Sequence, residues 1–213
     1  MKKLQDTFDK LQEKYGSKEL NSVYGYGDSD SPNVALVFMN PTKRNIATNK
    51  SWCGIRAQWL GTKQIWEFLT KCDLISKEIM CEIKAKKPSD WSPEFCEKVY
   101  RDVSNHKVWI TNLAKCSQDD ARPLPDKVFL EYKNLLLEEL DIIKPKKILF
   151  FGNQVSSIML DEKICVSQVR QKEYILSIGS KEYMAYAVYY PVGNGRFNQD
   201  KAIEDINAIL KNN

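Results

Sequence analysis

The chain has 213 residues, a size that fits one ordinary domain with a full apolar core. Hydrophobic residues make up 43% of it and charged residues 28%, without the run of about 18 apolar residues that a membrane-spanning helix needs and without a targeting segment at the start. The 32 Lys and Arg residues against 28 Asp and Glu residues give a net charge of +4, which excludes histone-like charge density but allows a local basic groove. We therefore expect a cytoplasmic protein without a membrane partner.

The cysteine and histidine content argues against a metal centre. The cysteines show no C-x-x-C pair, which disfavours both a zinc ribbon and a secreted disulfide scaffold. Their positions are Cys53, Cys72, Cys81, Cys96, Cys116 and Cys165. The single histidine, His106, excludes a multi-histidine site and precedes a predicted strand, so we expect it to have a structural or surface role.

The first part of the chain predicts a helix, a loop and a buried strand. Apolar residues recur at helical spacing in residues 4–15, and Gly16 closes this helix. A loop rich in Gly and Asp, residues 24–32, leads into the apolar run of residues 33–39. An unbroken apolar run is typical of a parallel strand that is covered on both faces.

The remaining elements alternate between helices and strands. In chain order the sequence predicts a helix at 61–69, a helical and loop segment at 73–104 interrupted by Pro88 and Pro93, a strand at 107–111, a helix at 127–143, a strand at 147–151, a short helix capped by Asn153, a hairpin-like excursion at 163–179 and a strand at 184–190. This alternation predicts an α/β fold, a three-layer αβα sandwich around a central, mostly parallel four-stranded sheet. We expect one domain, residues 1–213, with a helical insertion at about 73–104.

Four strand ends would meet at one edge of such a sheet. They carry Asn40, Asn112, Gly152 and the loop after Tyr190. Ligands bind beyond the carboxyl ends of the strands in open α/β sheets. Two amides fixed side by side offer a donor and an acceptor, which suits the edge of a nucleobase. The alternative is that Asn40, which precedes a proline, is an ordinary strand terminator.

The last of these ends continues into a loop, residues 191–198, that combines glycines with Arg196 and Phe197. Such a loop can approach a phosphate backbone closely or push a side chain into a base stack. Its alternative interpretation is a glycine-rich turn before the final helix.

The order of these segments resembles the uracil-DNA glycosylase superfamily over residues 20–212. The motifs are Tyr-Gly-Tyr-Gly-Asp at residues 24–28, Thr-Asn-Leu-Ala-Lys-Cys at 111–116, Pro-Lys-Lys-Ile-Leu-Phe-Phe-Gly at 145–152 and Tyr-Pro at 190–191. Their ordered combination is closest to family 4. The Asn-Pro pair at 40–41 is similar instead to the first motif of the mismatch-specific and single-strand-selective branches.

The resemblance implies a role for each matching residue. Asn40 would position the attacking water, and Tyr190 stands where relatives have the catalytic His, so both are candidate catalytic residues. Asn112 would read the extruded base, Trp52 would stack on it, and backbone N–H groups around Met39 would stabilise the departing base. The candidate DNA-binding residues are Lys43, Arg44, Lys115, Pro191, Gly193, Asn194 and Arg196.

Three departures from family 4 shape the expected chemistry. That family holds an iron–sulfur cluster on four cysteines, and only Cys116 has a counterpart here, so we predict no cofactor and no metal. Tyr190 can donate a hydrogen bond to a pyrimidine carbonyl but carries no cation, and family 4 has Glu where Asn40 stands.

The implied function is that of a monofunctional DNA glycosylase. It would hydrolyse the N-glycosidic bond of uracil or a related deaminated or modified base flipped out of DNA, and leave an abasic site for base excision repair. We expect DNA with such a base as the partner, a monomeric protein and a cytoplasmic, nucleoid-associated location.

Two alternatives remain open. A non-catalytic or modified-base-specific DNA-binding protein on the same fold would explain the missing His and carboxylate. A nucleotide-binding α/β enzyme unrelated to DNA is disfavoured, because the chain has no G-x-x-x-x-G-K-[ST] run and its Gly-x-Gly at residues 25–27 precedes a strand instead of opening a helix.

Overall fold

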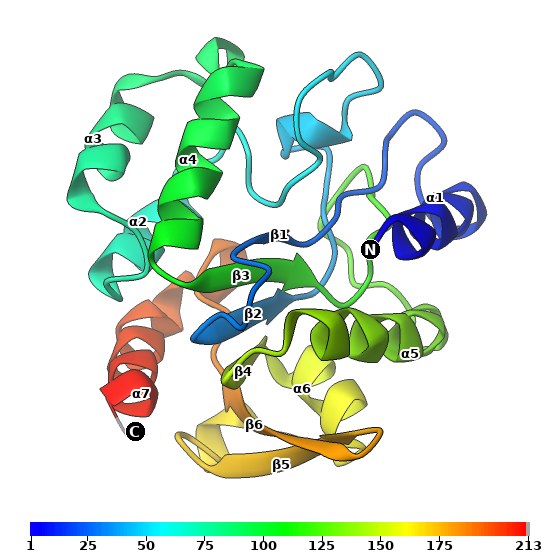
Figure 1. The fold of residues 1–213 in the computed structure, drawn as a ribbon, viewed down its shortest axis with the longest axis vertical. Helices are drawn as coiled ribbons and strands as arrows, with labels where there is room; N and C mark the ends of the chain where they lie inside the picture. Colours follow the sequence, from blue (N-terminus) through cyan, green and yellow to red (C-terminus); the bar gives the residue numbers. More distant parts are fainter. Residues whose placement is uncertain (212–213) are drawn as a thin grey trace.

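The computed structural model describes residues 1–211, which form a mixed sheet between two layers of helices (Figure 1). The strand order is β1-β3-β2-β4-β6-β5. The inner strands β3, β2, β4 and β6 are parallel, and the edge strands β1 and β5 are antiparallel to their neighbours. Their bounds are β1 (Tyr26–Gly27), β2 (Val34–Phe38), β3 (Val108–Asn112), β4 (Lys147–Phe151), β5 (Glu173–Ile178) and β6 (Lys181–Val188).

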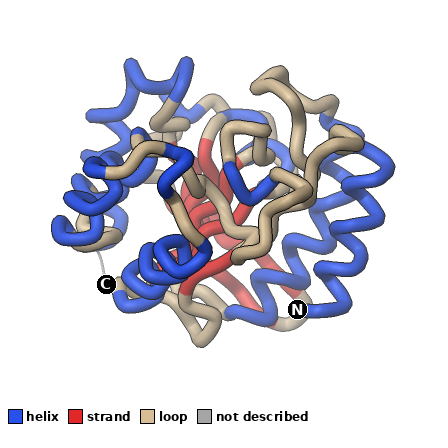
Figure 2. The backbone as a smooth tube through the Cα atoms, turned by 90° about the horizontal axis from the view of Figure 1, so that it is seen from above, coloured by secondary structure: helices blue, strands red, loops and turns tan. Residues whose placement is uncertain are grey.

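Helices cover both faces of this sheet (Figure 2). The apolar residues of α2, α3, α4 and α7 form one core cluster with one face, and those of α1, α5 and α6 form a second cluster with the other face. The helices are α1 (Lys2–Tyr15), α2 (Gln64–Lys71), α3 (Lys77–Ala85), α4 (Pro93–Asn105), α5 (Asp126–Ile143), α6 (Asn153–Leu160) and α7 (Gln199–Lys211). None of the helices in residues 1–211 is long and apolar enough to cross a membrane.

The predicted three-layer αβα sandwich is confirmed, with a wider sheet than expected. Every residue of β2, β3 and β4 is buried, which explains why these strands appear in the sequence as unbroken apolar runs. The expected four strands form the parallel centre, and the structure adds β1 and β5 at the edges. β1 has only two residues and β5 alternates between exposed and covered positions, so neither has an apolar run that would mark it.

The expected interruption at Pro88 and Pro93 is the break between α3 and α4. Pro93 starts α4, where its missing N–H costs nothing and the Ser92 hydroxyl accepts from Phe95 N. Two other local details of the sequence interpretation are corrected. Asn153 is not a cap, because Gly152 precedes the first turn of α6 and the Asn153 side chain accepts from Val166 N instead. The last inner strand was predicted at 184–190, whereas β6 ends at Val188.

The remaining segments follow the sequence interpretation. Residues 163–179 contain a short 3-10 helix and β5, which pairs antiparallel with β6 as the expected hairpin. Helices α3 and α4 fall in the expected segment 73–104, with α4 ending one residue beyond it, and contribute Ile79, Val99 and Tyr100 to the same core cluster as β2 and β3. That these residues are an insertion stays a prediction.

Candidate active site

The carboxyl ends of β2 and β3 bring two candidate site residues together. Phe38 and Asn112 are paired in the parallel register. Just beyond them, Leu113 N donates to Phe38 O at 2.7 Å and Ala114 N donates to Met39 O at 2.9 Å. Met39 and Asn40 therefore leave the sheet directly beside Asn112, at the edge where the sequence predicts a site.

Within residues 1–211, the side-chain oxygen of Asn40 has no hydrogen-bond partner and can accept from a ligand. Its side chain is half-buried, and its Nδ2 donates to the carbonyl of Pro41 at 3.2 Å. The amide oxygen can accept a hydrogen bond from a water molecule, but an amide cannot take the proton of that water as a carboxylate would.

Asn112 is buried, with only 1% of its surface exposed. Its Nδ2 donates to Gln58 Oε1 at 2.9 Å, whereas its Oδ1 is buried and has no hydrogen-bond partner in residues 1–211. A buried acceptor without a partner costs free energy on the order of 1–3 kcal/mol, so it marks a place where a ligand group can compensate that cost. The sequence interpretation missed Gln58, which lies in an irregular loop where no pattern singles it out.

Aromatic side chains surround this strand end. Phe38 stacks on Phe151 with ring centroids 4.2 Å apart, and Trp59 and Tyr190 meet the Phe38 ring edge-on at 5.1 and 6.1 Å. Side chains alternate along a strand, so Asn112 lies on the same face as Ile110, which shares the cluster of Phe38. The result is a largely apolar setting in which a flat base can be desolvated.

Tyr190 lies two residues beyond β6, which places its half-buried side chain at the edge of the sheet and not within it. Burial raises the pKa of Tyr190 to about 12. Its hydroxyl is therefore a neutral hydrogen-bond donor at physiological pH. Gly152 lies beside it, and its φ of 90° favours glycine, whereas a Cβ there would make only an ordinary contact of 3.7 Å with Tyr190 Cβ.

The loop after Tyr190 is held against the backbone and presents two exposed side chains. A Cβ on Gly195 would lie 2.0 Å from the Tyr190 carbonyl oxygen, so only glycine permits this approach. Phe197 is 82% exposed, and the Arg196 guanidinium lies 5.1 Å from its ring centroid. The exposed ring is accessible to a ligand, and its insertion into a base stack stays a prediction.

The comparison with known proteins decides the family. Residues 24–211 match the family model described as the uracil DNA glycosylase superfamily. The chain belongs to this superfamily. Membership supports a uracil-DNA glycosylase-like function in DNA repair, with DNA as the partner and N-glycosidic bond hydrolysis as the reaction typical of the family.

Trp52 occupies a half-buried position in this superfamily member. Its indole Nε1 donates to the carbonyl of Ile55 at 2.9 Å, and its ring packs against the core cluster of the Phe38 face. Gly54 approaches it closely, because a Cβ there would lie 2.7 Å from Trp52 Cζ2. The ring is thus fixed by its own loop, and stacking on a base stays a prediction.

The expected cationic residues divide into two groups. Lys43, Arg44 and Arg196 are exposed and free to contact phosphates. Lys115 is not, because it is fully buried and its Nζ forms an ion pair with the equally buried Glu139 at 2.7 Å. The prediction that Lys115 binds DNA is therefore wrong.

The reason is the path of the chain after β3, which turns inward and buries Lys115. Lys115 Nζ donates to Thr111 Oγ1 at 2.6 Å and to the carbonyl of Asn112. This lysine therefore stabilises the carboxyl end of β3 through hydrogen bonds. Burial lowers the pKa of Lys115, and the Glu139 carboxylate opposes that shift.

The cysteines do not fit the iron–sulfur cluster of family 4. Cys116, the one counterpart, is buried, its pKa is raised by burial, and Gln118 Nε2 lies 3.8 Å from its sulfur. Within residues 1–211, no group of three or more His, Cys, Asp or Glu side chains is arranged to hold a metal ion. The absence of a cluster from the purified protein stays a prediction.

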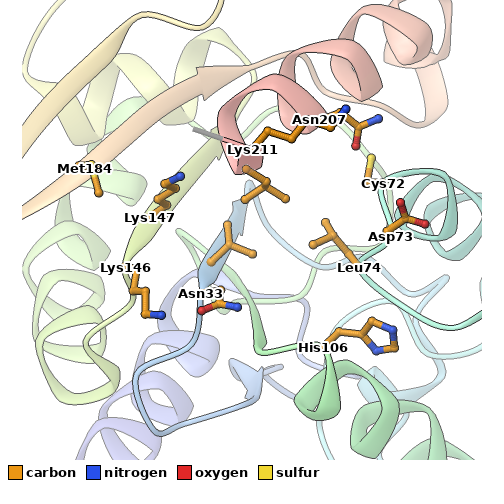
Figure 3. A pocket seen from close by; sticks show the side chains of 12 residues that line it. Asn33, Cys72, Asp73, Leu74, His106, Lys146, Lys147, Met184, Asn207 and Lys211 are labelled. Carbon is orange, nitrogen blue, oxygen red and sulfur yellow. The ribbon is translucent and has the colours of Figure 1, made fainter. Parts of the chain in front are cut away.

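A pocket of about 630 Å³ lies elsewhere on this glycosylase fold (Figure 3). Its lining includes Asn33, His106 and Lys146, which precede β2, β3 and β4. It is therefore at the amino ends of the parallel strands, across the sheet from Asn40 and Asn112. Ligand chemistry in α/β sheets belongs to the carboxyl ends, so we do not assign the reaction to this pocket.

Proposed function

We propose that this protein is a monofunctional DNA glycosylase that hydrolyses the N-glycosidic bond of uracil, or of a related deaminated or modified base, and leaves an abasic site. One observation carries the proposal. Two side-chain amides, Asn40 and Asn112, lie at adjacent strand ends. The Asn112 oxygen is buried on an aromatic-lined face and has no partner among the described residues 1–211. This is the arrangement that a flipped pyrimidine needs.

The reaction begins with extrusion of the target nucleotide from the base stack toward the ends of β2 and β3. Asn112 hydrogen-bonds the edge of the base. Cleavage of the glycosidic bond leaves positive character on the sugar and negative charge on the base. Asn40 orients a water molecule toward the sugar carbon of the breaking C–N bond. As the new C–O bond forms, the proton of that water passes to solvent, because the amide cannot hold it, and the departing base anion takes up a proton from solvent.

The departing base needs hydrogen-bond donors. Tyr190 supplies a neutral hydroxyl, and backbone N–H groups around Met39 are further candidates. A preorganised donor of this kind contributes on the order of 3 kcal/mol to transition-state stabilisation. Neither Asn40 nor Tyr190 carries charge, so we expect slower base release than in relatives that have a carboxylate and a His at these positions.

The DNA contacts follow from the loop and the exposed cations. Lys43, Arg44 and Arg196 bind phosphates, whereas Pro191, Gly193 and Asn194 shape the loop that carries Phe197 into the stack. Phosphate contacts position the protein and carry no sequence information. We further propose a monomer in a cytoplasmic, nucleoid-associated location, related to family 4 but without its cluster and with the Asn-Pro first motif of the mismatch-specific branch.

The test is base release from oligonucleotides that contain uracil, hypoxanthine, mismatched thymine or a modified pyrimidine, in single strands and duplexes. We expect uracil release by wild-type protein. Asn40→Ala and Asn112→Ala should each lower the single-turnover rate by about 100-fold or more, the loss typical of one catalytic polar contact. Asn33→Ala is the matched control, because Asn33 is exposed at the opposite edge of the sheet.

Failure of clean, folded wild-type protein to release any of these bases would refute the enzymatic proposal. Tight binding to uracil-containing or abasic DNA without turnover would then favour the non-catalytic alternative, for which the neutral Asn40 and Tyr190 are the motivating observations.

A further inference from the structure

A series of hydrogen bonds runs from the side chain of Asn112, the candidate base-reading residue, through the side chain of Gln58 to two backbone carbonyls. Gln58 Nε2 lies 3.5 Å from the carbonyl oxygens of Val23 and Tyr24, and Gln58 Oε1 accepts from Asn112 Nδ2 at 2.9 Å. Gln58 is itself 2% exposed, so no bulk water competes for these contacts.

This series of hydrogen bonds fixes which end of each amide faces which neighbour. A backbone carbonyl can only accept, so the two carbonyls require the NH₂ group of Gln58 on their side. The Gln58 oxygen then faces Asn112, which must donate a hydrogen bond to it from its own NH₂ group. The oxygen of Asn112 is left as the free acceptor, and it is the atom that is buried without a partner in residues 1–211.

The position of Gln58 is held independently of Asn112. Its backbone carbonyl accepts from the Tyr100 hydroxyl at 2.8 Å, and Tyr100 is a buried residue of α4. A rotation of the Asn112 amide would place its oxygen against the Gln58 oxygen, so that two acceptors face each other and the hydrogen bond is lost. A buried loss of this kind is strongly disfavoured.

We propose that Gln58 is a specificity-determining positioning residue, which locks the Asn112 amide so that the site presents its oxygen to the base. This inference rests on the proposed function. A base with an N–H group at its pairing edge, such as uracil, can donate to that oxygen. Cytosine has a ring nitrogen acceptor at the same place and is rejected, because two acceptors would face each other.

The test measures base binding as well as turnover. Free 5-fluorouracil and 5-fluorocytosine differ at this edge, and fluorine NMR titration gives the Kd of each. We expect wild-type protein to bind 5-fluorouracil about tenfold tighter or more, the discrimination typical of a good polar base contact. Gln58→Met keeps the volume but removes the acceptor, so this preference should fall to about threefold or less.

Gln12→Met is the matched control. Gln12 is also a buried glutamine that donates to one backbone group and accepts from another, at Ser17 O and Ser117 N. It should reproduce any general loss of stability in thermal unfolding while leaving the base preference unchanged. Single-turnover uracil release by Gln58→Met should fall about tenfold with little change in DNA affinity.

The outcomes separate the two proposals. A base preference that is absent from wild-type protein, or retained in Gln58→Met, overturns the role of Gln58 whether or not uracil is released. A preference that depends on Gln58 in a protein without base release supports the positioning role and contradicts only the hydrolysis.

Discussion

At the scale of single residues, the proposed chemistry depends on a tyrosine that stays protonated. Burial raises the pKa of Tyr190 to about 12, so both its donor function and its neutral state persist over the physiological range. Unfolded tyrosine has a pKa of about 10, so stability that depends on the neutral hydroxyl is complete below that pH and declines as the pH rises toward 12.

The Tyr190→Phe variant tests this donor. We expect the single-turnover rate of base release to fall about 100-fold, because one donor to the departing base is lost while the ring remains. The ratio of wild-type to variant rates should be constant between about pH 6 and 9, since the hydroxyl does not titrate there. A ratio that varies tenfold within that range would show that Tyr190 is not the donor.

Phe197 is the second single residue with a proposed role, which is stacking into DNA. Its ring is 82% exposed, so Phe197→Ala should leave thermal stability unchanged. If the ring stacks into DNA, base release from duplexes should fall by about tenfold, in line with the 1–3 kcal/mol of one stacking contact. Single strands, which need no unstacking of a partner strand, should be affected less.

Leu130→Ala supplies the comparison for Phe197, because Leu130 is 53% exposed on α5 and belongs to no proposed contact. Rates measured by gel analysis of abasic-site cleavage should be normal for this variant. Equal loss on duplex and single-stranded substrates in Phe197→Ala would contradict an intercalating role.

At the scale of elements, a buried ion pair joins the end of β3 to α5. Glu139 Oε1 accepts from Trp109 Nε1 at 2.9 Å, and Glu139 Oε2 pairs with Lys115 at 2.7 Å. Lys115 in turn bonds the carbonyl of Asn112. The helix thereby fixes the strand end that carries the base-reading amide.

Removal of one charge should be far more harmful than removal of both. Glu139→Gln leaves the Lys115 charge buried without compensation, and we expect a loss of about 3–5 kcal/mol in the free energy of unfolding by urea. The double variant Lys115→Met with Glu139→Gln should recover most of that loss, since the glutamine oxygen still accepts from Trp109. A double variant as unstable as the single one would contradict this account.

Elements were predictable where the signal is local. The runs that became β2, β3 and β4 are apolar throughout because both faces of the sheet are covered, and each predicted strand lies within two residues of the observed one. The edge strands and the early end of β6 were not predictable. An edge strand forms where a neighbouring strand offers hydrogen bonds, which its own residues do not indicate. The end of β6 was missed because the aromatic residues Tyr189 and Tyr190 have the same apolar pattern whether they lie inside a strand or after it.

At the scale of the molecule, the net charge of +4 is small. We therefore expect DNA affinity to depend on a few exposed cations and not on the overall charge. The Lys43→Ala and Arg44→Ala double variant should weaken binding to single-stranded DNA at all salt concentrations. It should also reduce the slope of log affinity against log salt by about 1.4, or about 0.7 for each lost phosphate contact. Fluorescence anisotropy at several salt concentrations measures this slope.

The control for this measurement is the Lys146→Ala and Lys211→Ala double variant. Both lysines are exposed beside the pocket at the amino ends of the strands, and the same net charge is removed (Figure 3). An equal reduction of the slope in this control would indicate that binding depends on overall charge and not on the edge that carries Asn40.

The sequence alone determined the sheet type, the helices on both faces and the placement of two amides at one edge of the sheet. These follow from apolar runs and breaks, which are local patterns that any chain segment carries in its own residues. The tertiary structure decided which polar atoms meet. Gln58 and Asn112 are 54 residues apart in the chain, and the partner that buries Lys115 lies on α5. Hydrogen bonds and ion pairs between distant segments depend on how layers pack, and no periodicity encodes that packing.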